Sequence, residues 1–153
     1  MANIVFNIAK GRVVEYYNRV ESSDPTNAAI ILVPIETTGL EADATLIDVD
    51  SLAALIAGTT NEQTTMGRKT LTDAELAALP APDDTNDRYD VSLPTVTWTA
   101  ATGNAISKIA VCYDPDTTGG TDSAIIPLTM FDFAITPDGS DVSMTTGVFF
   151  RAS

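Results

Sequence analysis

Three aspartates in one short segment carry the strongest chemical signal of the chain. Asp114, Asp116 and Asp122 lie in the segment DPDTTGGTD, where carboxylates precede a glycine pair. Carboxylate oxygens at alternating positions before a glycine are the ligands that a calcium loop supplies. The glutamate of such a loop, at its twelfth position, is replaced here by Ile125. A weak calcium site is therefore one hypothesis. A solvated or interface loop is the prediction, because Asp-Pro and Gly-Gly are ordinary parts of polar loops.

Two further acidic groups could in principle provide paired carboxylates. The first is DDTND, with Asp83, Asp84 and Asp87, and the second is the turn 138–141. Glycoside hydrolysis needs two carboxylates at a defined separation beside a substrate pocket. Both groups lie in polar, turn-rich segments with no apolar pocket signal, so we interpret them as solvated faces.

The rest of the catalytic inventory is sparse. The chain has no histidine, which is the commonest general base and a common metal ligand. Its one cysteine, Cys112, lies inside the apolar run IAVCY and is predicted to be a small buried residue. We therefore predict that the protein is not an enzyme and binds no cofactor.

Composition limits the partners of the protein. The 153 residues include 8 Lys and Arg against 21 Asp and Glu, giving a formal net charge of −13. That charge repels nucleic-acid phosphates and acidic membrane surfaces, and it favours a partner with a basic face. No signal peptide or membrane-length apolar run is recognisable, and one cysteine fits a reducing compartment. We expect no nucleic acid and no membrane among the partners.

The first half of the chain combines short helices and short strands. Val13, Tyr17 and Val20 recur with helical spacing, although their side chains also suit a strand. The other predicted elements are a strand over 3–8, a strand over 28–35 ending near Pro34, a helix over 49–57 capped by Asp48 or Asp50 and followed by Gly58, a strand within 66–71, and a short helix from the Thr72–Glu75 capping box to Pro80.

The second half is predicted to be all β. Strands are expected over 87–93, 96–99, 106–113, 124–128, 130–135, 142–144 and 147–151, with a hairpin-type loop at 101–104. This spacing predicts a mainly β protein with two or three short helices in its N-terminal half, folded as an antiparallel sandwich or open barrel. We expect a single domain over 1–153, in which mixed elements of 1–82 pack on a β block of 83–153.

Aromatic residues at strand spacing are more often core than ligand-binding, and we predict a core role for most of them. They are Trp98, Tyr113, Phe131, Phe133, Phe149 and Phe150. Phe149 and Phe150 are adjacent, so in a strand they point to opposite faces. One of them must leave the core or be covered by something else. Phe149, Phe150 and Arg151 are therefore our candidates for a subunit interface.

Four segments resemble small structural proteins of tailed bacteriophages. They are GRVVEYYNRV, VTWTAATGN, CYDPDTTGGTDSAIIPLTMFDFAITPDGSD and GVFFRAS. The resemblance implies a capsid cement or decoration protein that binds the major capsid protein on the outer surface of the shell, commonly as a trimer. It also implies synthesis in the host cytoplasm and a final location in the virion. Two alternatives remain: another virion role, in the tail tube or head completion, or a carbohydrate-binding β-sandwich using Trp98 and the loop 114–122.

Overall fold

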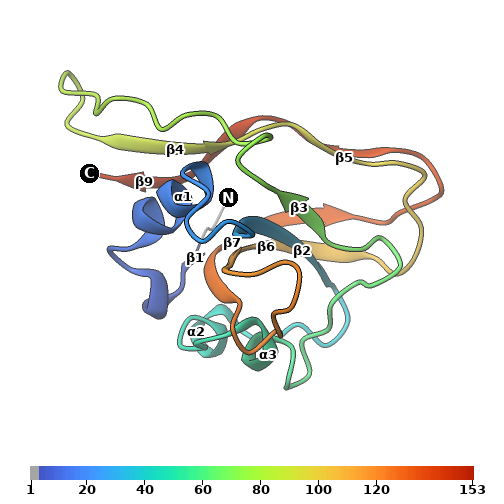
Figure 1. The fold of residues 1–153 in the computed structure, drawn as a ribbon. Coiled ribbons are helices and arrows are strands. Elements are labelled where there is room, and N and C mark those ends of the chain that lie inside the picture. The colour runs from blue at the N-terminus through green and yellow to red at the C-terminus, as the bar shows by residue number, and fades with distance from the viewer. Residues whose placement is uncertain (1–3) are drawn as a thin grey trace.

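A five-stranded antiparallel sheet lies at the centre of the protein (Figure 1). The computed structural model describes residues 4–153. In spatial order the strands are β1 (Ile4–Val5), β7 (Ile126–Ile135), β6 (Ile106–Asp114), β2 (Ala29–Glu36) and β3 (Lys69–Leu71). The sheet therefore combines strands from both halves of the chain.

The two central strands are the most apolar stretches of the sequence. β2 pairs with β6 along its whole length, from Ala29 opposite Asp114 to Glu36 opposite Ile106. Both strands are buried on both faces, which is why each is a nearly continuous apolar run with little alternation. Pro34 lies beyond the three β2 residues that pair with β3. Its carbonyl accepts a hydrogen bond from the backbone amide of Gln63. Its missing amide therefore interrupts no ladder with β3.

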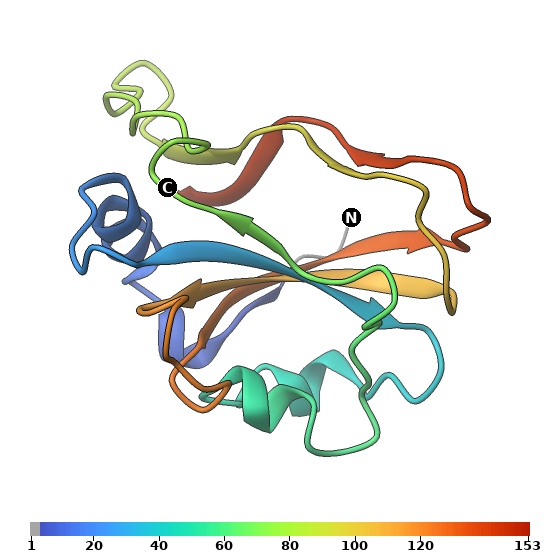
Figure 2. The same ribbon diagram turned by 45° about the vertical axis from the view of Figure 1, so that its right-hand side comes forward.

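A second β layer covers one face of this sheet (Figures 1 and 2). It consists of two consecutive two-stranded ribbons. In the first, β4 (Tyr89–Leu93) pairs with β9 (Gly147–Ala152), and in the second, β5 (Val96–Trp98) pairs with β8 (Val142–Met144). Where the ribbons join, the Thr146 amide donates to the Thr95 hydroxyl at 3.1 Å. Side chains of the sheet and of this layer form the larger hydrophobic core.

Helices cover the remaining surfaces of the sheet. The short helices α2 (Asp43–Leu46) and α3 (Leu52–Leu55) lie on the face opposite the ribbons, over a second apolar cluster. A 3-10 turn (Asn7–Ala9) leads into α1 (Val13–Glu21), which packs against the larger core. The Tyr17 hydroxyl of α1 donates to the Ala77 carbonyl at 2.8 Å, which ties this helix to the chain that enters β4.

The predicted fold class is confirmed. The protein is mainly β with three short helices, its sheets are antiparallel, and the arrangement is sandwich-like without a closed barrel. The strands at 29–36, 89–93, 96–98, 106–114, 142–144 and 147–152 lie where the sequence placed them, within about two residues. Residues 13–21 form a helix, which decides between the helix and the strand that their side chains left open.

Two predicted helices differ from the structure. α3 covers only Leu52–Leu55, and its N-cap is Ser51, whose hydroxyl accepts from the Ala54 amide at 3.1 Å. The prediction of Asp48 or Asp50 as cap was wrong, because the chain first makes the separate turn of α2. The Thr72–Glu75 capping contacts do form, with the Thr72 amide donating to the Glu75 carboxylate at 2.8 Å. They close a turn that does not continue into a helix.

Three β predictions also needed correction. The expected strands at 124–128 and 130–135 are one strand, β7, which continues through the buried Thr129 because threonine is β-branched and suits a strand. The loop 101–104 is no hairpin, since β5 and β6 belong to different layers. The strand predicted over 3–8 is observed only at Ile4–Val5, and residue 3 lies outside the described residues.

Candidate interaction groove

The proposed calcium ligands are engaged in other contacts. The Asp122 carboxylate accepts hydrogen bonds from Arg68 Nη1 at 2.7 Å and Nη2 at 2.9 Å. These hydrogen bonds lower the pKa of Asp122. Arg68 also donates from Nε and Nη2 to Glu62, at 2.7 and 2.6 Å. Arg68 therefore clamps the chain before β3 to the loop that precedes β7.

The other two aspartates stabilise their own loop. Asp114 is buried and accepts from the Asp116 amide at 2.9 Å, and Asp116 accepts from the Thr118 hydroxyl at 2.6 Å. Within residues 4–153, no three metal-ligating side chains are grouped to hold an ion. The loop 114–122 is thus held by internal hydrogen bonds and by Arg68, and nothing in its geometry favours a calcium site.

The remaining acidic segments are also turns. Asp83 accepts from the Asn86 side chain at 2.7 Å and faces Arg88 at 3.3 Å, while Asp84 and Asp87 are exposed. In the turn 138–141, the Asp138 carboxylate accepts a hydrogen bond from the Ser140 hydroxyl at 2.6 Å. These contacts order exposed loops, and they explain why acidic residues cluster there.

The two residues that could have marked a ligand site are buried. Trp98 is 2% exposed, and its indole Nε1 donates to the Gly67 carbonyl at 2.9 Å, so its ring cannot stack on a sugar. Cys112 is fully buried on the helical side of the sheet, and burial raises the pKa of its thiol. An unionised thiol in the core is chemically inert.

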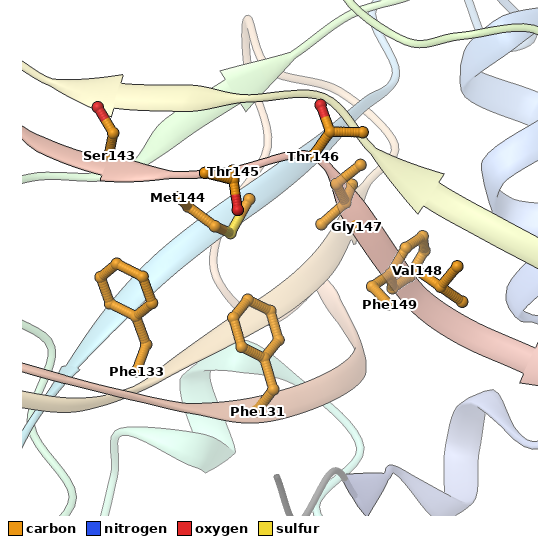
Figure 3. Close-up of a pocket in the computed structure, with 10 residues that line it drawn as sticks. Phe131, Phe133, Ser143, Met144, Thr145, Thr146, Gly147, Val148 and Phe149 are labelled. Atoms are coloured by element: carbon orange, nitrogen blue, oxygen red, sulfur yellow. The ribbon is translucent and has the colours of Figure 1, made fainter.

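Among the hollows on the described part of the chain is an apolar groove between the two β layers (Figure 3). Its cavity volume is about 300 Å³. Phe131 and Phe133 project from β7 toward Met144 and Phe149 of the ribbon layer, and Val148 lies at the rim. The polar lining comes from Ser143, Thr145 and Thr146. A lining of this kind suits apolar side chains of a partner, and no lining residue is a general base that could activate its hydroxyl groups.

The three predicted interface residues take different positions around this groove. Phe149 is a core residue, stacked on Tyr17 with ring centroids 6.3 Å apart, and one edge of it reaches the groove. Phe150 is half-buried on the other face of β9 and lines a second hollow beside the groove together with Arg151. Arg151 is an exposed residue that forms a two-pronged ion pair with Asp90, at 2.6 and 2.9 Å.

The sequence did not single out the groove. Val148 is 44% exposed and is the one large hydrophobic side chain so exposed within residues 4–153. The predicted core role is confirmed for Phe131, which is buried, and Phe133 is half-buried against the same core; their i, i+2 spacing places both on one face of β7. That spacing was the available signal. The spacing of Phe131 and Phe133 could not reveal the groove, because the second wall comes from β8 and β9. The position of these strands above β7 depends on the tertiary fold and is not encoded in the sequence near β7.

Comparison of the chain with protein-family models, with curated protein sequences and with solved structures found no match. Of the helices formed by residues 4–153, none has both the length and the apolar character needed to cross a lipid bilayer.

Proposed function

We propose that this protein is a structural subunit of a tailed-phage particle, a cement or decoration protein that binds the major capsid protein on the outer surface of the shell. The observation that carries the proposal is the apolar groove between β7 and the β8–β9 side of the ribbon layer, with Val148 exposed at its rim. The resemblance of four sequence segments to small phage virion proteins supplies the kind of partner.

The groove suits attachment to another protein. Exposed apolar surface bounded by polar residues is typical of protein interaction sites. Here the exposed Val148 and the half-buried Phe133 lie beside exposed serine and threonine residues of the ribbon layer, and the buried Phe131 and Met144 lie deeper in the groove. A groove of about 300 Å³ holds only a few side chains, so one contact is weak. Many copies on one shell, or a trimer with three grooves, would add such contacts into a strong attachment by avidity.

The charge of the protein supports the same role. A net charge of −13 keeps free copies soluble and apart before assembly. It also favours a shell whose outer surface is basic near the binding site. We include a trimeric assembly in the proposal, with the hollow beside Phe150 and Arg151 as its contact.

Co-sedimentation with purified capsids tests the proposal. The wild-type protein should pellet with expanded shells at a fixed copy number per capsomer. Val148→Lys should lose most of this binding, because it places a charge at the rim of an apolar site while leaving the core intact. Ala54→Lys, at an exposed position of α3 on the far side of the sheet, adds the same charge and should bind normally.

Particles that lack the protein separate the virion roles. A cement role requires fragile heads and normal tails, seen by negative-stain microscopy after heating. Stunted tails with stable heads would instead assign the protein to the tail. Equal binding of both lysine variants to capsids would mean that the groove is not the contact surface.

A further inference from the structure

The helix α3 is held in place by a distant loop of the chain. It has 4 residues, whereas an isolated helix needs about 12–15 residues to be even marginally stable in water. Its first two amides donate outside the helix, Leu52 to the Ile125 carbonyl at 2.9 Å and Ala53 to the Asp122 carbonyl at 3.0 Å. Both acceptors belong to the loop 115–125 between β6 and β7, which lies beside α3 (Figures 1 and 2). The position of α3 therefore depends on that loop.

The loop 115–125 is itself fastened by Arg68. The Asp122 carboxylate accepts from two nitrogens of the Arg68 guanidinium, which is bound in turn to Glu62. Within residues 4–153, the other hydrogen bonds from this loop to distant elements go to α3 and to Asn27. Asn27 is exposed, and its hydrogen bonds to the loop are 3.1–3.2 Å long, so water competes with them. The charged contact with Arg68 is therefore the strongest polar attachment of the loop.

We propose that α3 and the loop 115–125 open together as one unit while both β layers stay folded, and that Arg68 is the contact that keeps the unit closed. Leu52, Leu55 and Ile125 are buried in the second apolar cluster, so opening exposes their side chains. Opening gives up the burial of these few side chains, which costs less free energy than unfolding the whole core. The unit is a conformational switch that presents apolar surface when the ion pair is broken.

The boundary of the unit follows from the contacts of its neighbours. The helix α2 lies outside it, because the Asn7 amide donates to the Ile47 carbonyl at 2.8 Å and Lys108 of β6 pairs with Asp43 at 3.3 Å. Those contacts hold α2 to the 3-10 turn and to the sheet. At the other end, β6 and β7 pair with each other where the loop begins and ends. Opening therefore stops at the sheet.

Hydrogen exchange of the intact protein, followed by NMR under native conditions, tests the proposal. The amides of Leu52 and Ala53 report on the unit, and those of Ala110 and Val111, in the central strand β6, report on unfolding of the sheet. After correction for intrinsic exchange rates, Leu52 and Ala53 should share one exchange rate. That rate should be at least about tenfold higher than the rate of the two β6 amides.

Two variants separate opening of the unit from unfolding of the whole protein. Arg68→Met removes a contact that opening breaks, so exchange of Leu52 and Ala53 should become about thirtyfold faster. Phe150→Ala is the matched control, because Phe150 packs on the larger core, which lies on the other face of the sheet and stays folded when the unit opens. It should speed the β6 amides about fivefold and leave Leu52 and Ala53 unchanged.

A further variant covers the case in which Arg68→Met does not fold. Asp122→Asn removes the charge but keeps an oxygen that Arg68 can bind, so it should speed exchange of Leu52 and Ala53 about tenfold. A wild-type circular dichroism spectrum shows that each variant is folded.

Three results would overturn the proposal. The first is exchange of Leu52 and Ala53 at the rate of the β6 amides in the wild-type protein. The second is an equal effect of Phe150→Ala on both pairs of amides, which would mean that α3 is released only by global unfolding. The third is unchanged exchange of Leu52 and Ala53 when the charged contact between Arg68 and Asp122 is removed.

Discussion

Replacing Arg68 by methionine should destabilise the protein far more than replacing any surface arginine. Arg68 makes four charge-assisted hydrogen bonds, two to Glu62 and two to Asp122. Its side chain is 27% exposed, and that of Glu62 is only 10% exposed. The loop that Asp122 anchors also supports α3, because the Asp122 carbonyl accepts from the Ala53 amide at 3.0 Å. Removing the guanidinium therefore leaves a nearly buried carboxylate without its cation.

The size of the effect lies between two known limits. Breaking a fully buried ion pair costs about 3–5 kcal/mol, and an exposed pair contributes about 0–1 kcal/mol. For a partly buried arginine with two carboxylate partners, we expect Arg68→Met to lower the free energy of unfolding by about 2 kcal/mol. In a chain of this size, that loss lowers Tm by about 6 °C.

Urea and thermal unfolding followed by circular dichroism measure the change. Arg12→Met is the matched control, because Arg12 is about half exposed and pairs only with Glu15 of its own helix at 3.2 Å. It should change stability by less than about 0.5 kcal/mol. An Arg68→Met variant no less stable than Arg12→Met would refute the reasoning.

The effect should also depend on pH. Arg68 lowers the pKa of Asp122, so the ion pair contributes its full stabilisation above the ordinary aspartate pKa of about 3.9. That stabilisation is lost as the pH falls through the lower pKa of the folded state. The stability difference between wild type and Arg68→Met should therefore narrow below about pH 4. A difference that stays constant down to pH 2 would show that the charge of Asp122 is not involved.

Four further outcomes follow from burial and contacts. In urea unfolding, Phe149→Ala should lower the free energy of unfolding by about 3–4 kcal/mol, because Phe149 is a core residue. Phe150→Ala should lower it by about 1 kcal/mol, because Phe150 is only half-buried. Equal losses would contradict this assignment. Trp98→Phe should cost at least about 1 kcal/mol, because it loses the hydrogen bond from the indole to the Gly67 carbonyl and leaves part of a buried site unfilled. Burial raises the pKa of Cys112, so the thiol should react with a disulfide reagent only after unfolding. Millimolar calcium should leave Tm unchanged, since the aspartates of 114–122 are already hydrogen-bonded; a rise of several degrees would restore the calcium hypothesis.

Local sequence patterns predicted the elements whose signals come from their own residues. The runs at 29–36 and 106–114 are strands because they are apolar on both faces. The spacing of apolar residues in 13–21 favoured a helix, although their β-branched and aromatic side chains also suited a strand. Errors arose where tertiary contacts decide. Ser51 caps α3 because the chain turns after α2, and the amide of Leu52 donates to the Ile125 carbonyl of a distant loop. No pattern around residue 50 contains that partner.

The candidate site was harder to predict than the fold. Acidic residues drew attention to the loop 114–122, but their roles depend on Arg68, which is 54 residues away from Asp122 along the chain. Adjacent phenylalanines did indicate that one side chain of β9 leaves the core. The groove itself needs β7 and β9 to face each other, and residue types alone do not specify that distance.

The position of β2 in the sheet has a consequence for synthesis. β2 ends at Glu36, and its central partner β6 begins at Ile106, about 70 residues later; at about 5–20 residues per second, the ribosome needs roughly 4–14 s to cover that distance. During this time the run AIILVPI lacks its longest partner strand, because β3 pairs with only three of its residues, and exposed apolar strands favour aggregation between nascent chains. Pro34 lies within this run and has no amide to donate to a neighbouring chain. Pro34 therefore protects β2 from pairing with another chain before β6 is made. In the folded sheet the absent amide costs no hydrogen bond to β3, because β3 pairs only with Ile30–Leu32.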